Sequence, residues 1–160
     1  WIQNFKNYLF LNDKYGSYGI AFDLTITTPG LFCLKEMFDL AVELDVHTLI
    51  KTTFAFDGSV TMCPQVLPRE LFDEVIDDLL DYIKPKATGD PKHENWIECL
   101  EDLKKRQTFQ EKYPDWKEAL SRGKKNLVRV DKWRKNETSL EEIYSANTKV
   151  LEWWRAIKIQ

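Results

Sequence analysis

The stretch that decides the fold is residues 20–56, which read IAFDLTITTPGLFCLKEMFDLAVELDVHTLIKTTFAF. Residues 20–28 alternate apolar and polar side chains and are rich in β-branched residues, which is typical of a half-buried strand. The pair Pro29-Gly30 breaks that strand. Apolar residues then recur at helical spacing over residues 31–45, and a second β-branched and aromatic run covers residues 46–56. The stretch therefore predicts a strand, a helix and a strand in that order.

Two strands joined by an amphipathic helix predict a parallel β–α–β crossover of right-handed sense. A further helix follows, because Pro68 suits a first helical position and apolar residues recur at helical period up to Pro85, where we expect the helix to end. Residues 20–84 thus form a strand-helix-strand-helix unit of an α/β fold. Parallel strands are normally buried on both faces and need neighbours at their edges. We therefore predict a larger parallel sheet or barrel, whose other strands lie upstream or come from a partner chain.

The remainder of the chain predicts short helices, which form a mostly helical C-terminal cap. One of these helices should end before Gly123, residues 126–130 favour a short strand, and residues 138–142 contain a capping-box spacing. We place the boundary so that residues 1–86 are the C-terminal part of an α/β domain and residues 87–160 are the helical cap. Because the chain opens at Trp1 in what reads as the middle of an element, we expect its N-terminal strands to be missing.

Composition narrows the class of protein. The chain has 160 residues, of which 43% are hydrophobic and 31% are charged, as in a globular rather than a disordered protein. No run approaches the roughly 18 to 20 apolar residues that a membrane helix needs, so we expect a cytoplasmic protein with no membrane partner. The cysteines, Cys33, Cys63 and Cys99, are too far apart for a CxxC metal knuckle, and reduced thiols are expected.

The net charge of −3 argues against nucleic acid as a partner of the chain as a whole. Residues 117–135 break this acidic average, because they hold eight lysines and arginines against Glu118 and Asp131, with Trp116 and Trp133 interleaved. Such a run is usually a solvated helix face. The alternative is a surface for a nucleic acid or an acidic partner.

Candidate site residues lie where parallel strands end, because the loops of α/β sheets and barrels converge there. If Phe22, Leu24 and Ile26 face the helices, then Asp23, Thr25 and Thr27 turn to the interior of the sheet or barrel. On the second strand, Ile50, Thr52 and Phe54 should face the helices, which turns Lys51 and Thr53 inward. The candidate ligand contacts are Thr25, Thr27, Thr28, Lys51, Thr53 and Phe56.

These polar side chains are either a ligand site or an internal hydrogen-bond network. The chain contains no GxSxG, GxGxxG, P-loop or HExxH motif. We therefore expect that it carries no complete catalytic site by itself.

The run from residue 20 to residue 80 resembles the second half of radical S-adenosylmethionine (radical SAM) proteins with a SPASM or shortened twitch C-terminal region. The likeness lies in a strand ending in Thr, a helix opening near Leu31, a second strand entered after Asp45-Val46, and the turn Val66-Leu67-Pro68 that starts a helix. The tail is similar too, since residues 130–134 and then 138–140 match an Asp-x-x-Arg and Ser-Leu segment.

This resemblance implies that the two strands are the fifth and sixth of a TIM-like partial (β/α)6 barrel. It implies polar contacts to S-adenosylmethionine from Thr25, Thr27 and Thr28, and packing of Phe56 on the adenine. In the family, an N-terminal CxxxCxxC loop binds the [4Fe-4S] iron-sulfur cluster that reductively cleaves S-adenosylmethionine.

This sequence has no CxxxCxxC, so either the loop lies upstream or the chain is a degenerate relative. Cys63 and Cys99 are too few for an auxiliary cluster, and the substrate would be a peptide or a small molecule. The alternative function is a non-catalytic α/β interaction module whose sheet edge pairs with another chain.

Overall fold

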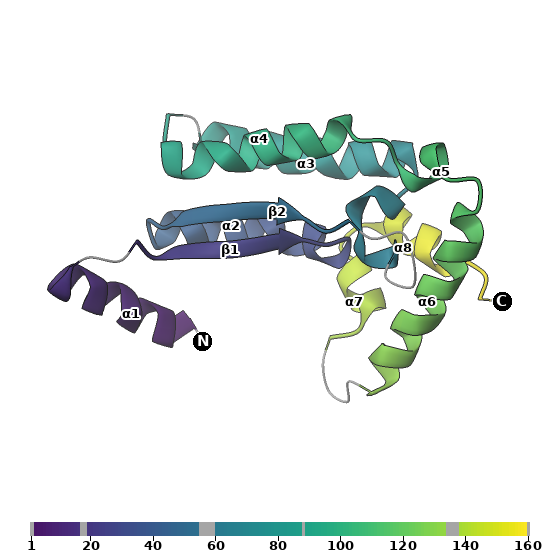
Figure 1. Ribbon diagram of the computed structural model, residues 1–160, viewed down its shortest axis with the longest axis horizontal. Coiled ribbons are helices and arrows are strands. Elements are labelled where there is room, and N and C mark those ends of the chain that lie inside the picture. Colours follow the sequence, from purple (N-terminus) through teal and green to yellow (C-terminus); the bar gives the residue numbers. More distant parts are fainter. Residues whose placement is uncertain (1, 17–18, 55–59, 88, 134–137, 160) are drawn as a thin grey trace.

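The computed structural model describes residues 2–16, 19–54, 60–87, 89–133 and 138–159 (Figure 1). Its strands are β1 (Ala21–Ile26) and β2 (His47–Thr52). Its α-helices are α1 (Ile2–Tyr15), α2 (Leu34–Glu43), α3 (Arg69–Ala87), α4 (Pro91–Lys105), α5 (Phe109–Lys112), α6 (Trp116–Trp133), α7 (Leu140–Tyr144) and α8 (Thr148–Ala156). Three short 3₁₀ helices, η1 (Pro29–Cys33), η2 (Val60–Met62) and η3 (Pro64–Val66), follow the strand ends.

The predicted strand-helix-strand-helix order is confirmed. β1 and β2 are parallel, with Ala21 opposite His47 and Ile26 opposite Thr52, and α2 connects them. The pairing continues for one more residue, because the Thr53 backbone N–H donates to the Ile26 carbonyl at 3.1 Å. The fold is α/β, and the described residues contain this two-stranded sheet within a mostly helical chain. The partial barrel stays a prediction.

Helices cover one face and one edge of this sheet. α3 packs against α2 and α4, and α4 packs against β2 (Figure 1). The Asn95 side chain on α4 donates a hydrogen bond to the Thr48 carbonyl, which occupies a backbone acceptor of β2. Phe38 of α2 is fully buried and meets the ring of Trp96 edge-on at a centroid distance of 5.3 Å. The helices therefore supply the apolar surface that the strands need.

The main hydrophobic core runs across the expected boundary between residues 86 and 87. It contains Phe22 and Ile26 of β1 together with Trp96 of α4 and Tyr144 and Trp154 of the C-terminal helices. At its N-terminal side, α1 attaches through a contact between the Phe5 and Phe22 rings at 4.8 Å. One continuous core thus joins the strands to the helices that follow them.

A second, smaller core lies beyond the carboxyl ends of the strands. It holds the 3₁₀ segments after β2 against α5 and α6, through Val60, Cys63, Val66, Phe109, Ala119 and Leu120. Gly123 lies at this contact, where an added Cβ would be 2.9 Å from Thr61 Cγ2 and 3.0 Å from Val60 Cγ1. The glycine is therefore required by the close approach of α6 to η2.

Three predictions about secondary structure are wrong. α6 does not end before Gly123, and residues 126–130 are helical rather than a strand. The β-branched character of this segment is overridden because tertiary contacts hold α6 as a helix. Leu127 and Val128 pack, partly buried, on the main core, and Lys124 donates to a carbonyl of α8. α3 also continues through Pro85 to Ala87, because a proline in the last turn removes only one of the final intrahelical hydrogen bonds.

The capping-box prediction is confirmed. The Glu142 backbone N–H donates to Ser139 Oγ at 3.2 Å, and the Ser139 backbone N–H donates to Glu142 Oε2 at 2.6 Å. Among the described residues, no helix combines the length and the hydrophobicity that a membrane span requires.

Candidate functional site at the carboxyl ends of the strands

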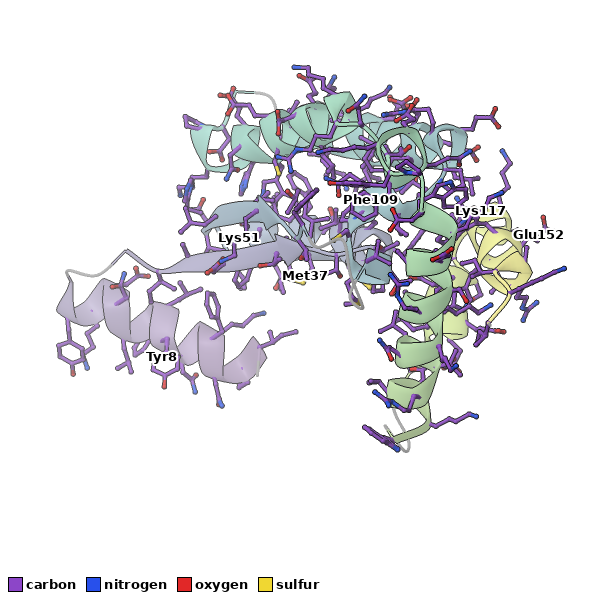
Figure 2. The ribbon with its side chains drawn as sticks, turned by 45° about the vertical axis from the view of Figure 1, so that its right-hand side comes forward. Tyr8, Met37, Lys51, Phe109, Lys117 and Glu152 are labelled. Atoms are coloured by element: carbon purple, nitrogen blue, oxygen red, sulfur yellow. The ribbon has the colours of Figure 1, made fainter. Side chains whose placement is uncertain are left out.

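The two faces of β1 separate as the alternation predicted. Phe22 and Ile26 are buried and Leu24 is half-buried, whereas Asp23 and Thr25 are exposed. On β2, Thr48 is buried while Leu49 and Lys51 are exposed. The structure therefore brings the predicted residues Thr25 and Lys51 together on one open face, where they are register partners. Figure 2 shows where Lys51 lies on the sheet.

Opposite charges meet on this open face. Lys51 Nζ lies 2.7 Å from Asp23 Oδ1 and 2.9 Å from Asp23 Oδ2, so the pair bridges the two strands. The two side chains are 59% and 63% exposed, and an ion pair this open contributes little to stability. It does hold an ammonium and a carboxylate side by side, where a polar or zwitterionic ligand can bind both.

Thr27 and Thr28 lie in a tight turn after β1. Thr27 Oγ1 accepts a hydrogen bond from the Gly30 backbone N–H at 3.1 Å, which fixes the start of η1. Thr28 is fully buried, and its backbone N–H donates to the Met62 carbonyl at 2.9 Å. The Thr28 hydroxyl has no partner among the described residues. Thr28 thus lies beneath the loop that follows β2, while Thr27 is half-buried at the strand end.

The end of β2 agrees with the expectation only in part. Thr53 is half-buried, and Phe56 lies outside the described residues. Phe54, expected to face the helices, meets the ring of Phe109 on α5 edge-on at 5.9 Å but is 57% exposed. It contacts a helix yet stays largely in solvent, because it lies beyond Thr53, where the pairing with β1 stops.

Arg106 is a site residue that the sequence did not reveal. Its guanidinium donates to Thr52 Oγ1 at 2.6 Å and to Asp102 Oδ2 at 2.6 Å. These groups border a hollow of about 660 Å³ along β2, which Ile50, Lys51, Asn95, Glu98 and Cys99 also line. Arg106 follows α4 without any local motif, so only the packing of α4 on β2 brings it to the strand end.

A second hollow lies in the cap, between the start of α6 and the end of α8. It measures about 370 Å³, and its walls include Trp116, Leu120, Trp153 and Ile157. Lys117 stands at its rim, at the upper end of α6 in Figure 2. Two indoles and two aliphatic side chains make this groove suited to an apolar group of a ligand.

The cysteines and histidines do not assemble into a metal centre. Within the described ranges, no three His, Cys, Asp or Glu side chains gather in a way that would hold a metal ion. Cys63 is buried, and burial raises the pKa of the Cys33 and Cys99 thiols. His93 is buried and meets the Phe38 ring edge-on, which is a packing role. The described residues therefore provide no ligand set for an iron-sulfur cluster.

Comparison of the chain with protein families, with curated proteins and with solved structures finds no significant match. The case for function consequently rests on the sequence pattern and on the geometry described above.

Proposed function

We propose that this chain is the C-terminal portion of a radical S-adenosylmethionine enzyme, to which it contributes two parallel strands and a helical cap over the substrate. The observation that carries the proposal is the open polar face of the sheet. Among the described residues, helices cover one face of the parallel strands, and the other face presents Asp23, Thr25 and Lys51. Polar side chains on the uncovered face of a parallel sheet suit a ligand-lined barrel interior.

The charged and hydroxyl side chains on the open face are complementary to S-adenosylmethionine. Its amino-acid end carries an ammonium and a carboxylate, which are complementary to Asp23 and Lys51, 2.7 Å apart across the strands. Thr25 and Thr53 add hydroxyl groups near the same strand ends. In the proposal these residues hold and orient S-adenosylmethionine, and the cap groove at Trp116 and Trp153 receives part of a peptide or small-molecule substrate.

The [4Fe-4S] cluster that such an enzyme requires does not fit the described residues, which lack a cysteine set for it. We therefore assign no step through the cluster to this chain. In the proposal an upstream CxxxCxxC loop would hold it, and its chemistry would be the one-electron reduction of S-adenosylmethionine.

The first test is the coding sequence upstream of Trp1. We expect an open reading frame that extends the chain and contains three closely spaced cysteines. The whole protein, reconstituted anaerobically with iron and sulfide, should show the electron paramagnetic resonance signal of a reduced [4Fe-4S] cluster and release 5′-deoxyadenosine. An uninterrupted upstream sequence without the three cysteines would exclude the proposal.

The site is tested in the same whole protein by Lys51→Met, which keeps the aliphatic stem and removes the charge. We expect S-adenosylmethionine to bind roughly tenfold more weakly, because one charge-assisted hydrogen bond is worth about 1.5 kcal/mol. Lys149→Met is a matched control. Lys149, on α8, is also exposed (62%), and its Nζ lies 2.6 Å from the Glu74 carboxylate on α3. Equal affinities in the two variants would show that Lys51 does not contact the ligand.

A second candidate is a non-catalytic interaction module. It is favoured by the free edge of β1, which pairs only with β2 among the described residues, and by the exposed side chains of Leu49 and Phe54. A partner chain would then complete the sheet. We expect the isolated chain to self-associate or to have a low midpoint of thermal unfolding. A stable, dilute monomer in analytical ultracentrifugation would contradict both candidates, because both require a neighbour for this sheet.

A further inference from the structure

The basic residues of α6 are sorted by the fold into two groups. Four of them form a line along one side of the helix, because their spacings of three, four and three residues place them one turn apart. This line, the α6 basic stripe, consists of Arg122, Lys125, Arg129 and Lys132, all exposed. Lys124 points the other way, is buried, and donates to the Trp154 and Ile157 carbonyls at 2.6 and 2.9 Å. Lys124 is therefore structural, and the stripe faces solvent.

Three of the four cations of the stripe have no carboxylate partner among the described residues. Several cations on the other helices do lie against carboxylates, such as Lys104 on Asp77 and Arg155 on Glu141. Arg122, Arg129 and Lys132 form no ion pair with any described residue. Asp131, which is also on α6, accepts a hydrogen bond from the Leu140 backbone N–H. The stripe is therefore a local excess of positive charge on a chain whose net charge is −3.

An aromatic side chain adjoins the stripe at its C-terminal end. Trp133 is 71% exposed, and the Arg129 guanidinium lies 5.5 Å from the centre of its ring. Beside them, Lys125, Asn126, Val128, Arg129, Lys132 and Ile159 line a hollow of about 350 Å³. Exposing the apolar surface of an indole to water is unfavourable unless a partner covers it. An unpaired base can stack on the flat face of the ring while its phosphates meet the neighbouring cations.

We propose that the α6 basic stripe and Trp133 form a binding surface for single-stranded nucleic acid. Phosphate groups bind along the stripe, whose first and last residues are ten positions or about 15 Å of helix apart, and a base stacks on Trp133. An acidic polypeptide would satisfy the cations but leaves the indole without a stacking partner. A duplex presents phosphates but keeps its bases stacked on each other.

The test is a fluorescence anisotropy titration of the full chain with a labelled oligothymidylate of about 12 nucleotides. If three or four phosphates are contacted, raising the salt from about 50 to 200 mM should weaken binding roughly 20- to 50-fold. The duplex of the same length and a fluorescent oligoglutamate peptide are titrated in parallel, and both should bind more weakly. Absence of saturable binding at low salt, or equal binding of the duplex or the peptide, would overturn the proposal.

Variants separate charge from stacking. Arg122→Glu combined with Arg129→Glu should abolish binding, whereas Trp133→Ala should weaken it about 5- to 100-fold and leave the salt dependence unchanged. Arg129→Glu is also made alone, and Lys14→Glu is its matched control, because it changes the net charge equally on α1, at the opposite end of the molecule (Figure 1). Circular dichroism verifies that each variant is folded. If Lys14→Glu weakens binding as much as Arg129→Glu, the attraction is not local and the assignment is wrong.

Discussion

The two faces of the small sheet have opposite characters. On the covered face, Ile26 is 1% exposed and Thr48 is fully buried beneath helices of the same chain. On the open face, Thr25 and Lys51 are exposed, and Leu49 keeps 57% of its surface in water. Parallel strands are normally buried on both sides, whereas the described helices bury only one face of this sheet.

The residues that stabilise the fold and the residues available to a ligand therefore lie on opposite faces of the sheet. Residues on the covered face contribute apolar burial, which dominates folding free energy. The polar side chains on the open face stay hydrated in the folded protein. They therefore contribute little to the folding free energy. Mutations on the two faces should therefore have very different effects.

The largest effect is expected at Ile26. Ile26→Ala removes buried methyl groups from the main core and should lower the free energy of unfolding by about 2 to 5 kcal/mol. The adjacent Thr25→Ala, on the open face of the same strand, should change it by about 0.5 kcal/mol or less. Urea titrations monitored by circular dichroism measure both values. Comparable losses in the two variants would mean that the open face is buried in solution.

A smaller loss is expected where the cap meets the loop behind the sheet. Gly123→Ala would gain roughly 1 kcal/mol of helix propensity, but its methyl group would lie 2.9 Å from Thr61 Cγ2 in a packed contact. We expect a net destabilisation of about 1 to 2 kcal/mol. Arg122→Ala, its exposed neighbour, is the control and should be nearly neutral. A gain in the midpoint of thermal unfolding for Gly123→Ala would show that α6 is not held against η2.

The smallest effect concerns an ion pair that ties α3 to α5. Arg69 on α3 donates to Glu111 Oε1 at 3.1 Å and Oε2 at 2.8 Å, and also to the Arg106 carbonyl at 2.6 Å. The Arg69 guanidinium and then the Thr108 backbone N–H hold the pKa of Glu111 at about 2, against an ordinary 4.5. Because this pKa is lowered by folding, the contribution is complete above pH 4.5 and disappears as the pH falls towards 2.

Glu111→Gln should therefore lower stability near neutral pH by about 1 kcal/mol or less, since the pair is partly exposed. The deficit relative to the parent should shrink between pH 4.5 and pH 2. Thermal unfolding across this range measures the difference. Glu152→Gln, an exposed change on α8, is the control and should follow the parent at every pH. A deficit that stays constant down to pH 2 would contradict the ion-pair origin.

The sequence alone determined the β–α–β unit, the faces of β1 and the Ser139 capping box, because these depend on periodicity and hydrogen bonds over a few residues. The tertiary structure decided the rest. It kept α6 helical through Gly123, turned Lys124 inward to the end of α8, and brought Arg106 to Thr52 across 54 positions of the chain. Those outcomes follow from close packing between distant segments, whose geometry no local pattern contains.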